Sequence, residues 1–332
     1  MKNIMITGGA GFIGSNLVKY MNRCHEECMF YIVDKLTYAA DIKNIAPYID
    51  NINCFFFDYD ITDRALMKAF VWNNDIDTII HLAAESHVDN SIDSPVDFIQ
   101  TNIIGTFNLL EAARQSWEVK GMEGKRFHHV STDEVYGSLN TGDEAFTEIT
   151  PYNPRSPYSA SKASSDHLVM AYYHTYGLPV TISNCSNNYG PNQHEEKFIP
   201  KYIKCLVEGK PMPVYGTGMN VRDWLYVEDH VKAIDLILQK GTIGETYNIG
   251  GANELSNLDI ATVIRKAYSM VTGKSKGMET IKFVEDRKGH DFRYAINFDK
   301  ITQELGWVPE TDFNKGIKNT IKYYINKYKS LQ

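Results

Sequence analysis

The segment Val130–Gly137 and the downstream pair Tyr158 and Lys162 supply two separate sets of proton-transfer groups. The spacing Tyr-x-x-x-Lys suits oxidation of an alcohol by a nicotinamide cofactor. Asp133 and Glu134, an adjacent acid and base, suit the elimination of water. A single site that holds both sets would oxidise a sugar, dehydrate it and reduce it again.

The protonation states of these groups decide whether they can react. A free tyrosine has a pKa of about 10, so Tyr158 needs a nearby cation to act as a base. Lys162 lies one helical turn further on, where its ammonium group favours the phenolate, and the cationic nicotinamide of NAD would add to this effect. The carboxyl groups can divide the work only if Asp133 stays protonated while Glu134 is ionised. An Asp-Glu pair after a strand is otherwise usually a solvated loop.

A glycine-rich turn lies upstream of both sets. Thr7–Gly14 joins an apolar strand to a helical pattern and contains G-x-G-x-x-G at Gly9, Gly11 and Gly14. Such glycines let backbone N–H groups approach a pyrophosphate closely. The next predicted strand ends at Asp34, about twenty residues on, where a carboxylate accepts hydrogen bonds from a ribose and repels a 2'-phosphate. The pattern therefore favours NAD over NADP.

The elements that must position these groups alternate between strands and helices, as in a parallel sheet covered on both faces. Predicted strands are Asn3–Thr7, Phe30–Val33, Asn53–Phe57, Thr78–Leu82, Phe127–Ser131 and Val180–Asn184. Predicted helices are Phe12–Asn22, Thr62–Trp72, Val96–Ser116, Ser159–Tyr176, Ile199–Glu208, Asp229–Lys240, Leu258–Met270 and Asn314–Tyr328.

The pattern changes in the second half, where Pro- and Gly-rich connections become frequent after Cys185. We expect an α/β protein with a Rossmann, doubly wound parallel sheet and a smaller α/β substrate-binding lobe. The predicted boundaries are 1–185 for the NAD-binding domain and 186–332 for the nucleotide-sugar-binding lobe, with segments near 223–250 returning to the first domain.

Composition narrows the function classes. The chain has 332 residues and a net charge of -7, which argues against a surface that coats nucleic acid. No stretch approaches the roughly 20 apolar residues of a membrane helix, and no signal-like segment follows the start. The five cysteines are scattered, as expected for free thiols in the cytoplasm. Cys24 and Cys28 with His25 lack two further ligands, so we expect no metal site.

The chain resembles the extended short-chain dehydrogenases/reductases and, among them, the dTDP-glucose 4,6-dehydratases. The resemblance runs from Met1 to roughly Tyr294. It is carried by the motifs Thr7–Ser15, Val33–Ala39, His81–Asp89, Ser131–Gly137, Asn184–Pro191, Asn220–Trp224 and Asp286–Asp291. One departure is Lys288, where relatives often carry proline.

The resemblance implies a mechanism for a lyase of deoxysugar biosynthesis. The counterpart of Tyr158 deprotonates the C4 hydroxyl of the sugar while hydride moves from C4 to NAD. Glu134 then removes the C5 proton, and Asp133 protonates the departing C6 hydroxyl. Hydride returns to C6, which leaves a 4-keto-6-deoxy sugar. Thr132 is expected to hydrogen-bond near the C4 oxygen, and Lys162 completes the catalytic set.

The resemblance also implies which residues bind the two ligands. The expected NAD-binding residues are Gly8, Gly11, Phe12, Ile13, Gly14, Asp34, Lys35, Leu36, Thr37, Asp60, Ile61, Leu82, Ala83, Ala84, Thr101, Tyr158, Lys162 and Asn188. The expected substrate-binding residues are Ser86, His87, Thr132, Asp133, Glu134, Asn187, Lys197, Pro213, Tyr215, Arg222, Asn257, Arg287, His290 and Tyr294. Arg222 and Arg287 are expected near the diphosphate.

Three other functions compete with this interpretation. A 4,6-dehydratase of a UDP-, CDP- or GDP-linked sugar would need the same groups. A nucleotide-sugar 4-epimerase would share the NAD site and Tyr158 but would need no acid-base pair such as Asp133 and Glu134. A catalytically silent dinucleotide-binding regulator would not need the intact set. The apolar faces of helices Val96–Ser116 and Ser159–Tyr176, which family members pair across a two-fold axis, predict a homodimer.

Overall fold

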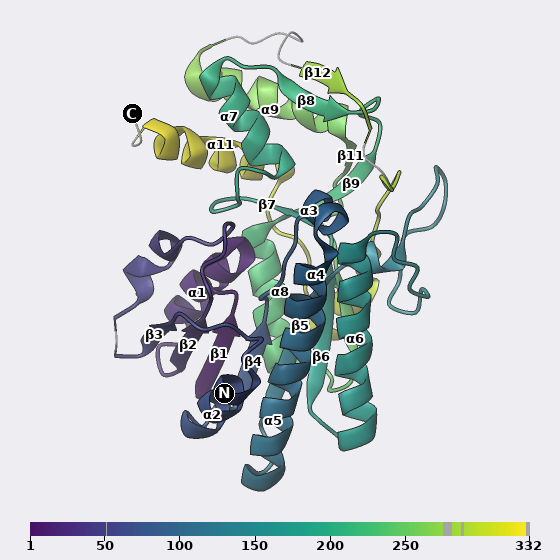
Figure 1. Ribbon diagram of the computed structural model, residues 1–332. Helices are drawn as coiled ribbons and strands as arrows, with labels where there is room; N and C mark the ends of the chain where they lie inside the picture. The colour runs from purple at the N-terminus through teal and green to yellow at the C-terminus, as the bar shows by residue number, and fades with distance from the viewer. Residues whose placement is uncertain (51, 275–280, 287–288, 330–332) are drawn as a thin grey trace.

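A parallel sheet forms the centre of the larger lobe, in the lower half of Figure 1. The computed structural model describes residues 1–50, 52–274, 281–286 and 289–329. The sheet has seven strands in the order β10-β6-β5-β4-β1-β2-β3, and all its neighbours are parallel. Its strands are β1 (Asn3–Thr7), β2 (Met29–Val33), β3 (Cys54–Phe57), β4 (Thr78–His81), β5 (Arg126–Thr132), β6 (Val180–Cys185) and β10 (Thr246–Ile249). The six predicted strands are confirmed to within one residue at each end.

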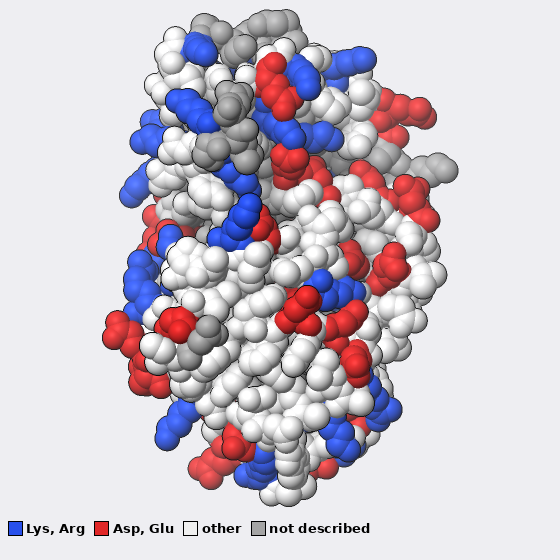
Figure 2. Space-filling view, turned by 60° about the vertical axis from the view of Figure 1, so that its left-hand side comes forward, with Lys and Arg blue, Asp and Glu red and all other residues white. Residues whose placement is uncertain are grey.

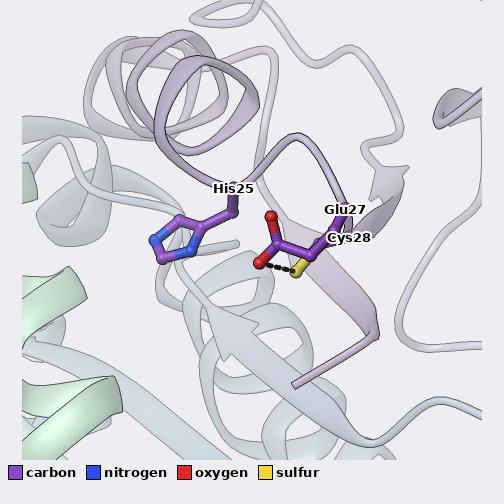
Figure 3. A group of neighbouring side chains, drawn as sticks. All are labelled: His25, Glu27 and Cys28. Atoms are coloured by element: carbon purple, nitrogen blue, oxygen red, sulfur yellow. Dashed lines mark hydrogen bonds between the residues drawn. The ribbon is translucent and has the colours of Figure 1, made fainter.

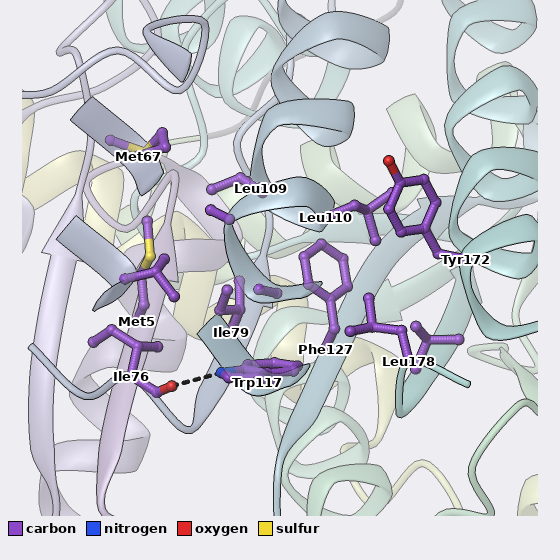
Figure 4. Close-up of a cluster of buried hydrophobic side chains, with 14 of the residues drawn as sticks. Met5, Met67, Ile76, Ile79, Leu109, Leu110, Trp117, Phe127, Tyr172 and Leu178 are labelled. Atoms are coloured by element: carbon purple, nitrogen blue, oxygen red, sulfur yellow. Dashed lines mark hydrogen bonds between the residues drawn. The ribbon is translucent and has the colours of Figure 1, made fainter. Parts of the chain in front are cut away.

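Helices cover both faces of this sheet, as the Rossmann prediction requires. Along β1, Ile4 and Ile6 point toward α1 (Phe12–Cys24) and α8 (Val227–Lys240). Met5 points to the opposite face, which α2 (Arg64–Asn73), α5 (Thr106–Lys120) and α6 (Pro157–Tyr176) cover. Figure 4 shows the core on that face, where the buried indole of Trp117 donates a hydrogen bond to the Ile76 carbonyl at 2.8 Å. The doubly wound sheet is therefore confirmed.

The predicted helix Val96–Ser116 is interrupted. The structure has α4 (Pro95–Phe98), a π-helical segment η3 (Ile99–Gly105) and then α5. The side chain of Asn102 bonds to the backbone of Glu85, and the Asn102 carbonyl accepts from the hydroxyls of Thr106 and Ser165. These side-chain bonds take the place of regular helical ones. Such π segments are frequent at functional sites, and this one carries Thr101.

A smaller lobe lies above the sheet in Figure 1. Its helices α7 (Phe198–Glu208), α9 (Asn257–Thr272) and α11 (Phe313–Lys329) share one buried apolar cluster. Its strands are β8 (Met212–Tyr215) paired with β12 (Ile281–Val284), and β11 (Glu254–Ser256), β9 (Val221–Tyr226) and β7 (Asn187–Tyr189) in a second small sheet. The remaining short helices are η1 (Ile42–Asn44), η2 (Ala46–Tyr48), α3 (Val88–Asp93), η4 (Asp133–Tyr136) and α10 (Asp299–Leu305).

The chain returns to the large sheet after entering the smaller lobe. Helix α8 packs against α1, and β10 pairs with β6 at the sheet edge, whereas β9 belongs to the small sheet. Strand β10 was not among the predicted strands; it contains Asn248, and asparagine is depleted in strands. The division into 1–185 and 186–332, with a return near 223–250, stays a prediction.

The surface carries charges of both signs. On the face that Figure 2 shows, Lys and Arg side chains are interspersed with Asp and Glu among uncharged residues. This distribution differs from the continuous basic stripe that is typical of nucleic-acid-binding proteins. Within the described residues, no helix is long and apolar enough to cross a membrane.

Candidate active site

A cavity of about 290 Å³ lies at the carboxyl ends of the central strands. Strands β1 and β4 are neighbours there: β2 and β3 follow on the side of β1, and β5, β6 and β10 follow on the side of β4. This switch point is where doubly wound sheets bind ligands. The predicted residues that line the cavity are Gly8, Gly11, Phe12, Ile13, Gly14, Asp34, Lys35, Thr37, Ile61, Leu82, Ala83, Ala84, Ser86, Thr101, Thr132, Asp133, Glu134, Tyr158, Lys162, Asn187, Asn188 and Lys197.

The glycine turn leaves no room for side chains. A Cβ on Gly14 would lie 2.1 Å from the Gly8 carbonyl oxygen, and one on Gly8 would lie 2.7 Å from the Ala83 nitrogen. Gly8 also has a φ of +70°, which favours glycine. Helix α1 begins at Phe12 with Gly11 as its N-cap, and Gly11 offers no side chain to the first N–H groups. The first turn of α1 therefore presents backbone donors to the cavity, as an anion site requires.

Asp34, at the end of β2, is buried and held by the backbone. Its Oδ2 accepts from the Ala10 N–H at 3.0 Å, and its Oδ1 accepts from the Leu36 N–H at 2.9 Å. Burial raises the pKa of this carboxyl group, and the backbone bonds oppose that rise. The Lys35 ammonium, next in the chain, contacts Asp60 at 3.3 Å and Thr101 at 3.4 Å.

The acid-base pair lies where β5 ends. Thr132 closes β5, and Asp133 and Glu134 open the short helix η4. The Thr132 hydroxyl accepts from the Glu134 N–H at 3.3 Å and donates to Asp133 Oδ1 at 3.4 Å. Thr132 also lowers the pKa of Tyr158, against the larger effect of burial.

Asp133 is held in its neutral form. Its side chain is 2% exposed, and its Oδ2 has no hydrogen-bond partner in the part of the chain that the structure describes. Burial raises the pKa of Asp133 well above its ordinary value, and the charges of Glu134 and Asp223 raise it further. Arg222 opposes this effect without reversing it. The protonated state expected of Asp133 therefore agrees with its surroundings.

The expected effect of Lys162 on Tyr158 stays a prediction. Burial raises the pKa of the Tyr158 phenol well above 10, and the charge of Glu134 adds to the rise. The Lys162 ammonium donates to the Val130 carbonyl at 2.8 Å. Spacing predicted that the two residues share a face of α6, but it could not show that the ammonium is engaged with β5.

The predicted substrate residues fall into two groups. Lys197 reaches the cavity rim and donates to the Ser86 carbonyl at 2.8 Å. Arg222 is buried beside Asp133, with its guanidinium 4.2 Å from the centre of the Tyr294 ring and bonded to the Asp291 carbonyl at 3.0 Å. Arg222 lies beside the cavity without lining it, and the expected substrate residues that do line the cavity are Ser86, Thr132, Asp133, Glu134, Asn187 and Lys197.

The second group lies outside the cavity lining. The Tyr215 hydroxyl donates to Asp89 at 3.4 Å, and the edge of the Tyr215 ring faces His290. His290 in turn lies 2.6 Å from Asp286. The other expected residues absent from the lining are Leu36, Asp60, His87, Pro213, Arg222, Asn257 and Tyr294. Arg287 lies outside the described residues.

Several lining residues were missed by the sequence prediction. Cys185 ends β6 at the same sheet edge as Thr132, so the carboxyl-end rule could have found it. The loop around His194 comes from the other lobe and carries no local signal. The missed lining residues are Val33, Ala39, Ala40, Tyr59, Glu85, Val130, Ser131, Cys185, Ser186, Gln193, His194 and Glu196.

His25, Glu27 and Cys28 form a group of possible metal ligands away from this cavity (Figure 3), with ligand atoms within 4.8 Å of one another. His25 is already bonded to Asp235 at 2.8 Å. Burial, followed by the charge of Glu27, raises the pKa of the Cys28 thiol to about 11, whereas metals bind the thiolate. The expectation of no metal site stays a prediction.

Comparison with known proteins identifies close relatives. A family model described as GDP-mannose 4,6 dehydratase matches residues 5–320. The dTDP-glucose 4,6-dehydratase of Neisseria meningitidis is 49% identical, over 98% of this chain and 94% of its own length.

Two solved structures of dTDP-glucose 4,6-dehydratases, both with NAD bound, share the fold. The protein from Bacillus anthracis has a TM-score of 0.87 and 43% identity, covering 99% of this chain and 98% of its own. The protein from Streptomyces venezuelae has a TM-score of 0.90 and 40% identity, with the same two coverages.

Proposed function

The chain belongs to the family of the dTDP-glucose 4,6-dehydratases, within the extended short-chain dehydrogenases/reductases, and we propose on this premise how its residues perform that reaction. It converts dTDP-glucose to dTDP-4-keto-6-deoxyglucose and is a hydro-lyase that depends on NAD. The single observation that carries the residue assignment is the buried Asp133 beside Glu134, in one cavity with Tyr158 and Lys162, where burial raises the pKa of Asp133 well above its ordinary value. A 4-epimerase would not need that acid.

The glycine turn and the end of β2 fit the cofactor. A Cβ on Gly8 or Gly14 would collide with the backbone of Ala83 or Gly8, so only glycine allows the tight turn that brings the first turn of α1 to the cavity, where its N–H groups can bind a pyrophosphate. The fixed carboxylate of Asp34 suits the ribose hydroxyls, and Lys35 and Thr101 lie next to it. When bound, NAD would accept the hydride from C4, return it to C6 and supply a cationic nicotinamide ring to the cavity.

Tyr158 is proposed as the base that takes the C4 hydroxyl proton, and Thr132 is a neighbour that lowers the pKa of its phenol. Burial and the charge of Glu134 oppose ionisation of the Tyr158 phenol. Two cations therefore have to favour the phenolate, the Lys162 ammonium and the nicotinamide ring of bound NAD. Lys162 is one of them, since its buried ammonium lies one helical turn from Tyr158. Asn188 is fixed nearby by His230 at 2.9 Å and completes the wall of the cavity.

Asp133 and Glu134 are proposed to divide the elimination. Glu134 removes the C5 proton, which the C4 carbonyl has made acidic, and Asp133 gives its proton to the C6 hydroxyl as it leaves. The buried position of Asp133 provides the proton at neutral pH because its pKa is raised. Lys197, Arg222 and Arg287 are proposed to bind the diphosphate, whose two charges need cations on a chain of net charge -7.

We further propose a cytoplasmic homodimer. The described structure has all five cysteines as free thiols, which suits a reducing compartment. Val96, Ile99 and Ile104 are exposed apolar side chains on α4 and η3, at 62%, 48% and 39%. These residues belong to the helical segment that was expected to pair with a second copy.

The activity has a direct label test. Purified protein incubated with dTDP-glucose deuterated at C4 should form the 4-keto-6-deoxy product with the deuterium at C6 and no net use of NAD. NAD accepts the hydride from C4 and returns it to C6 within one turnover, so the deuterium moves to C6 and no NAD is consumed. Product NMR reads the label. Deuterium recovered at C4, or a galactose product, would show an epimerase instead.

Glu134→Gln tests the division of roles. Dehydration should fall by about 10²–10⁴, the usual effect of losing one acid-base group, while C4 oxidation persists. Single-turnover absorbance of reduced nicotinamide follows oxidation, and product NMR follows dehydration. Glu144→Gln, on an exposed loop, is the matched control and should change neither step. An equal loss of both steps would assign Glu134 a positioning role.

Gly14→Ala tests the cofactor cradle. The new Cβ would lie 2.1 Å from the Gly8 oxygen, so the turn has to move. A loss of about 1.4 kcal/mol of binding free energy weakens binding tenfold. We expect a larger loss of NAD affinity than this, measured by calorimetry. Gly177→Ala, at the C-cap of α6 with open space around it, is the control. It should lower stability without weakening NAD binding, and equal NAD affinity in both variants would contradict the assignment.

Substitution of charged residues in the exposed apolar segment of α4 and η3 tests the dimer. Light scattering at low micromolar concentration should give a dimer mass for the native protein and a monomer mass for the double variant Val96→Glu and Ile99→Glu. Burial of the two new carboxylates in the interface costs more free energy than the apolar contacts of this segment contribute to the dimer. Met270→Glu is the control, since Met270 is 72% exposed on α9 in the other lobe. A monomeric native protein would overturn the dimer.

A further inference from the structure

Two buried polar side chains next to Lys162, those of His129 and Asp166, have no role in the reaction as proposed. The ammonium of Lys162 lies 3.3 Å from Nε2 of His129 on β5. The same Nε2 lies 3.2 Å from Oδ1 of Asp166, one helical turn beyond Lys162 on α6. The side chains of His129 and Asp166 are 1% and 2% exposed. One imidazole therefore bridges the lysine and a buried carboxyl group.

The carboxyl group of Asp166 is anchored on its other oxygen. Its Oδ2 accepts from the Ser131 hydroxyl at 2.8 Å and from the Tyr152 hydroxyl at 3.0 Å. Burial raises the pKa of Asp166 to about 6, against the favourable charge of Lys162 and these two hydrogen bonds. A carboxyl group that ordinarily titrates near 4 is thus moved close to neutral pH.

The ring of His129 lies between the two charged groups. Burial, and then the charge of Lys162, holds the pKa of His129 well below its usual range, so the ring is neutral and carries one N–H. Its Nε2 hydrogen-bonds with the Lys162 ammonium, whereas Asp166 Oδ1, although 3.2 Å from that nitrogen, has no hydrogen-bond partner among the described residues. Asp166 therefore acts on Lys162 through its charge.

We propose that Asp166 is a positioning residue for this reaction: across the ring of His129, it provides the negative charge that keeps Lys162 an ammonium ion one helical turn from Tyr158. The inference rests on the proposed function of Tyr158 and Lys162. Burial lowers the pKa of Lys162, and the charge of Asp166 is the first of the effects that oppose it. Without that charge a buried lysine loses its proton at lower pH and no longer favours the phenolate.

Other titratable groups face Lys162, His129 and Asp166 from every side. His81 on β4 lies with its ring 5.1 Å from that of His129, and burial holds its pKa well below its usual range. Burial raises the pKa of the Cys185 thiol on β6 to about 12 and those of Tyr136 and Tyr152 further. His167 is exposed on α6 beside the Tyr152 ring. The buried ones among these groups stay neutral at pH 6 to about 9, so Asp166 is the carboxylate that balances Lys162.

Asp166→Asn removes the charge and keeps the shape. The amide oxygen can still accept from Ser131 and Tyr152, and the amide nitrogen can donate to a bare Nε2 of His129. In the pH profile of C4 oxidation, measured in single turnovers of the NAD-loaded enzyme, the alkaline limb should move down by about 1–2 pH units because Lys162 loses its proton earlier. An alkaline limb that stays in place in a folded, NAD-loaded variant would overturn the proposal.

Two variants separate this effect from a structural one. Asp166→Glu retains the charge and should restore the alkaline limb to within about half a pH unit, even where the rate falls. Ser165→Ala removes a buried hydroxyl from the same turn of α6, where it bonds to the Asn102 and Ser161 carbonyls. It should lower the melting temperature and leave the limb unchanged. A limb that moved equally in Ser165→Ala would refute a specific role for Asp166.

A second measurement does not depend on turnover. With ¹⁵N-labelled histidine, the ring nitrogens of His129, assigned with His129→Gln, should change their shifts with a midpoint at pH about 6. Tyr152→Phe removes one hydrogen bond to the Asp166 carboxylate, so the midpoint should rise. A protein that fails to process the sugar but shows this titration would contradict the proposed function alone. Signals of His129 that do not respond to pH around 6 in the native protein would contradict the coupling itself.

Discussion

Exclusion of water from the floor of the cavity is the constraint on which the chemistry depends. Asp133, Tyr158, Lys162 and Asp166 are all buried, and for each of them burial is the largest influence on the pKa. Desolvation disfavours every charged form, so each charge that persists needs a partner within the protein or the ligands. The same effect that keeps Asp133 supplied with a proton makes it hard to ionise Tyr158. Asp133 and Tyr158 therefore need different neighbours although they line the same cavity.

The parallel sheet provides those neighbours because it gathers strand ends from distant parts of the chain. Thr132 and Cys185 end adjacent strands, and they face each other in the register of β5 and β6. Helix α6 then lays Tyr158 and Lys162 across this edge, with its start fixed by a capping box at Ser156. The smaller lobe closes the site from above. Rigid elements thus set the proton-transfer distances, and loops from the second lobe decide what is admitted.

Sequence patterns predicted the parts of this arrangement that depend on local spacing. The glycines before α1, the distance to Asp34 and the pair on α6 follow from helix and strand periods, and so did the strands of the large sheet. The π segment was missed because Asn102 is pulled toward Glu85 and Ser161, both remote in sequence. The orientation of Lys162 and the environment of Asp133 were also beyond prediction, since they depend on burial. The roles of the site residues stay predictions, because geometry places them without showing a reaction.

Proton balance adds one more requirement to this closed site. In the proposed turnover Tyr158 gains the C4 hydroxyl proton, Asp133 gives one to the leaving water, and Glu134 takes the C5 proton and returns it. The overall reaction releases no proton, so the next cycle needs a proton moved from the phenol to the carboxyl group. The Thr132 hydroxyl donates to Asp133 at 3.4 Å, and Thr132 lowers the pKa of Tyr158, so it lies close to both groups. A hydroxyl both donates and accepts, so it can pass a proton between them. This explains why a threonine, rather than a purely steric residue, suits the end of β5.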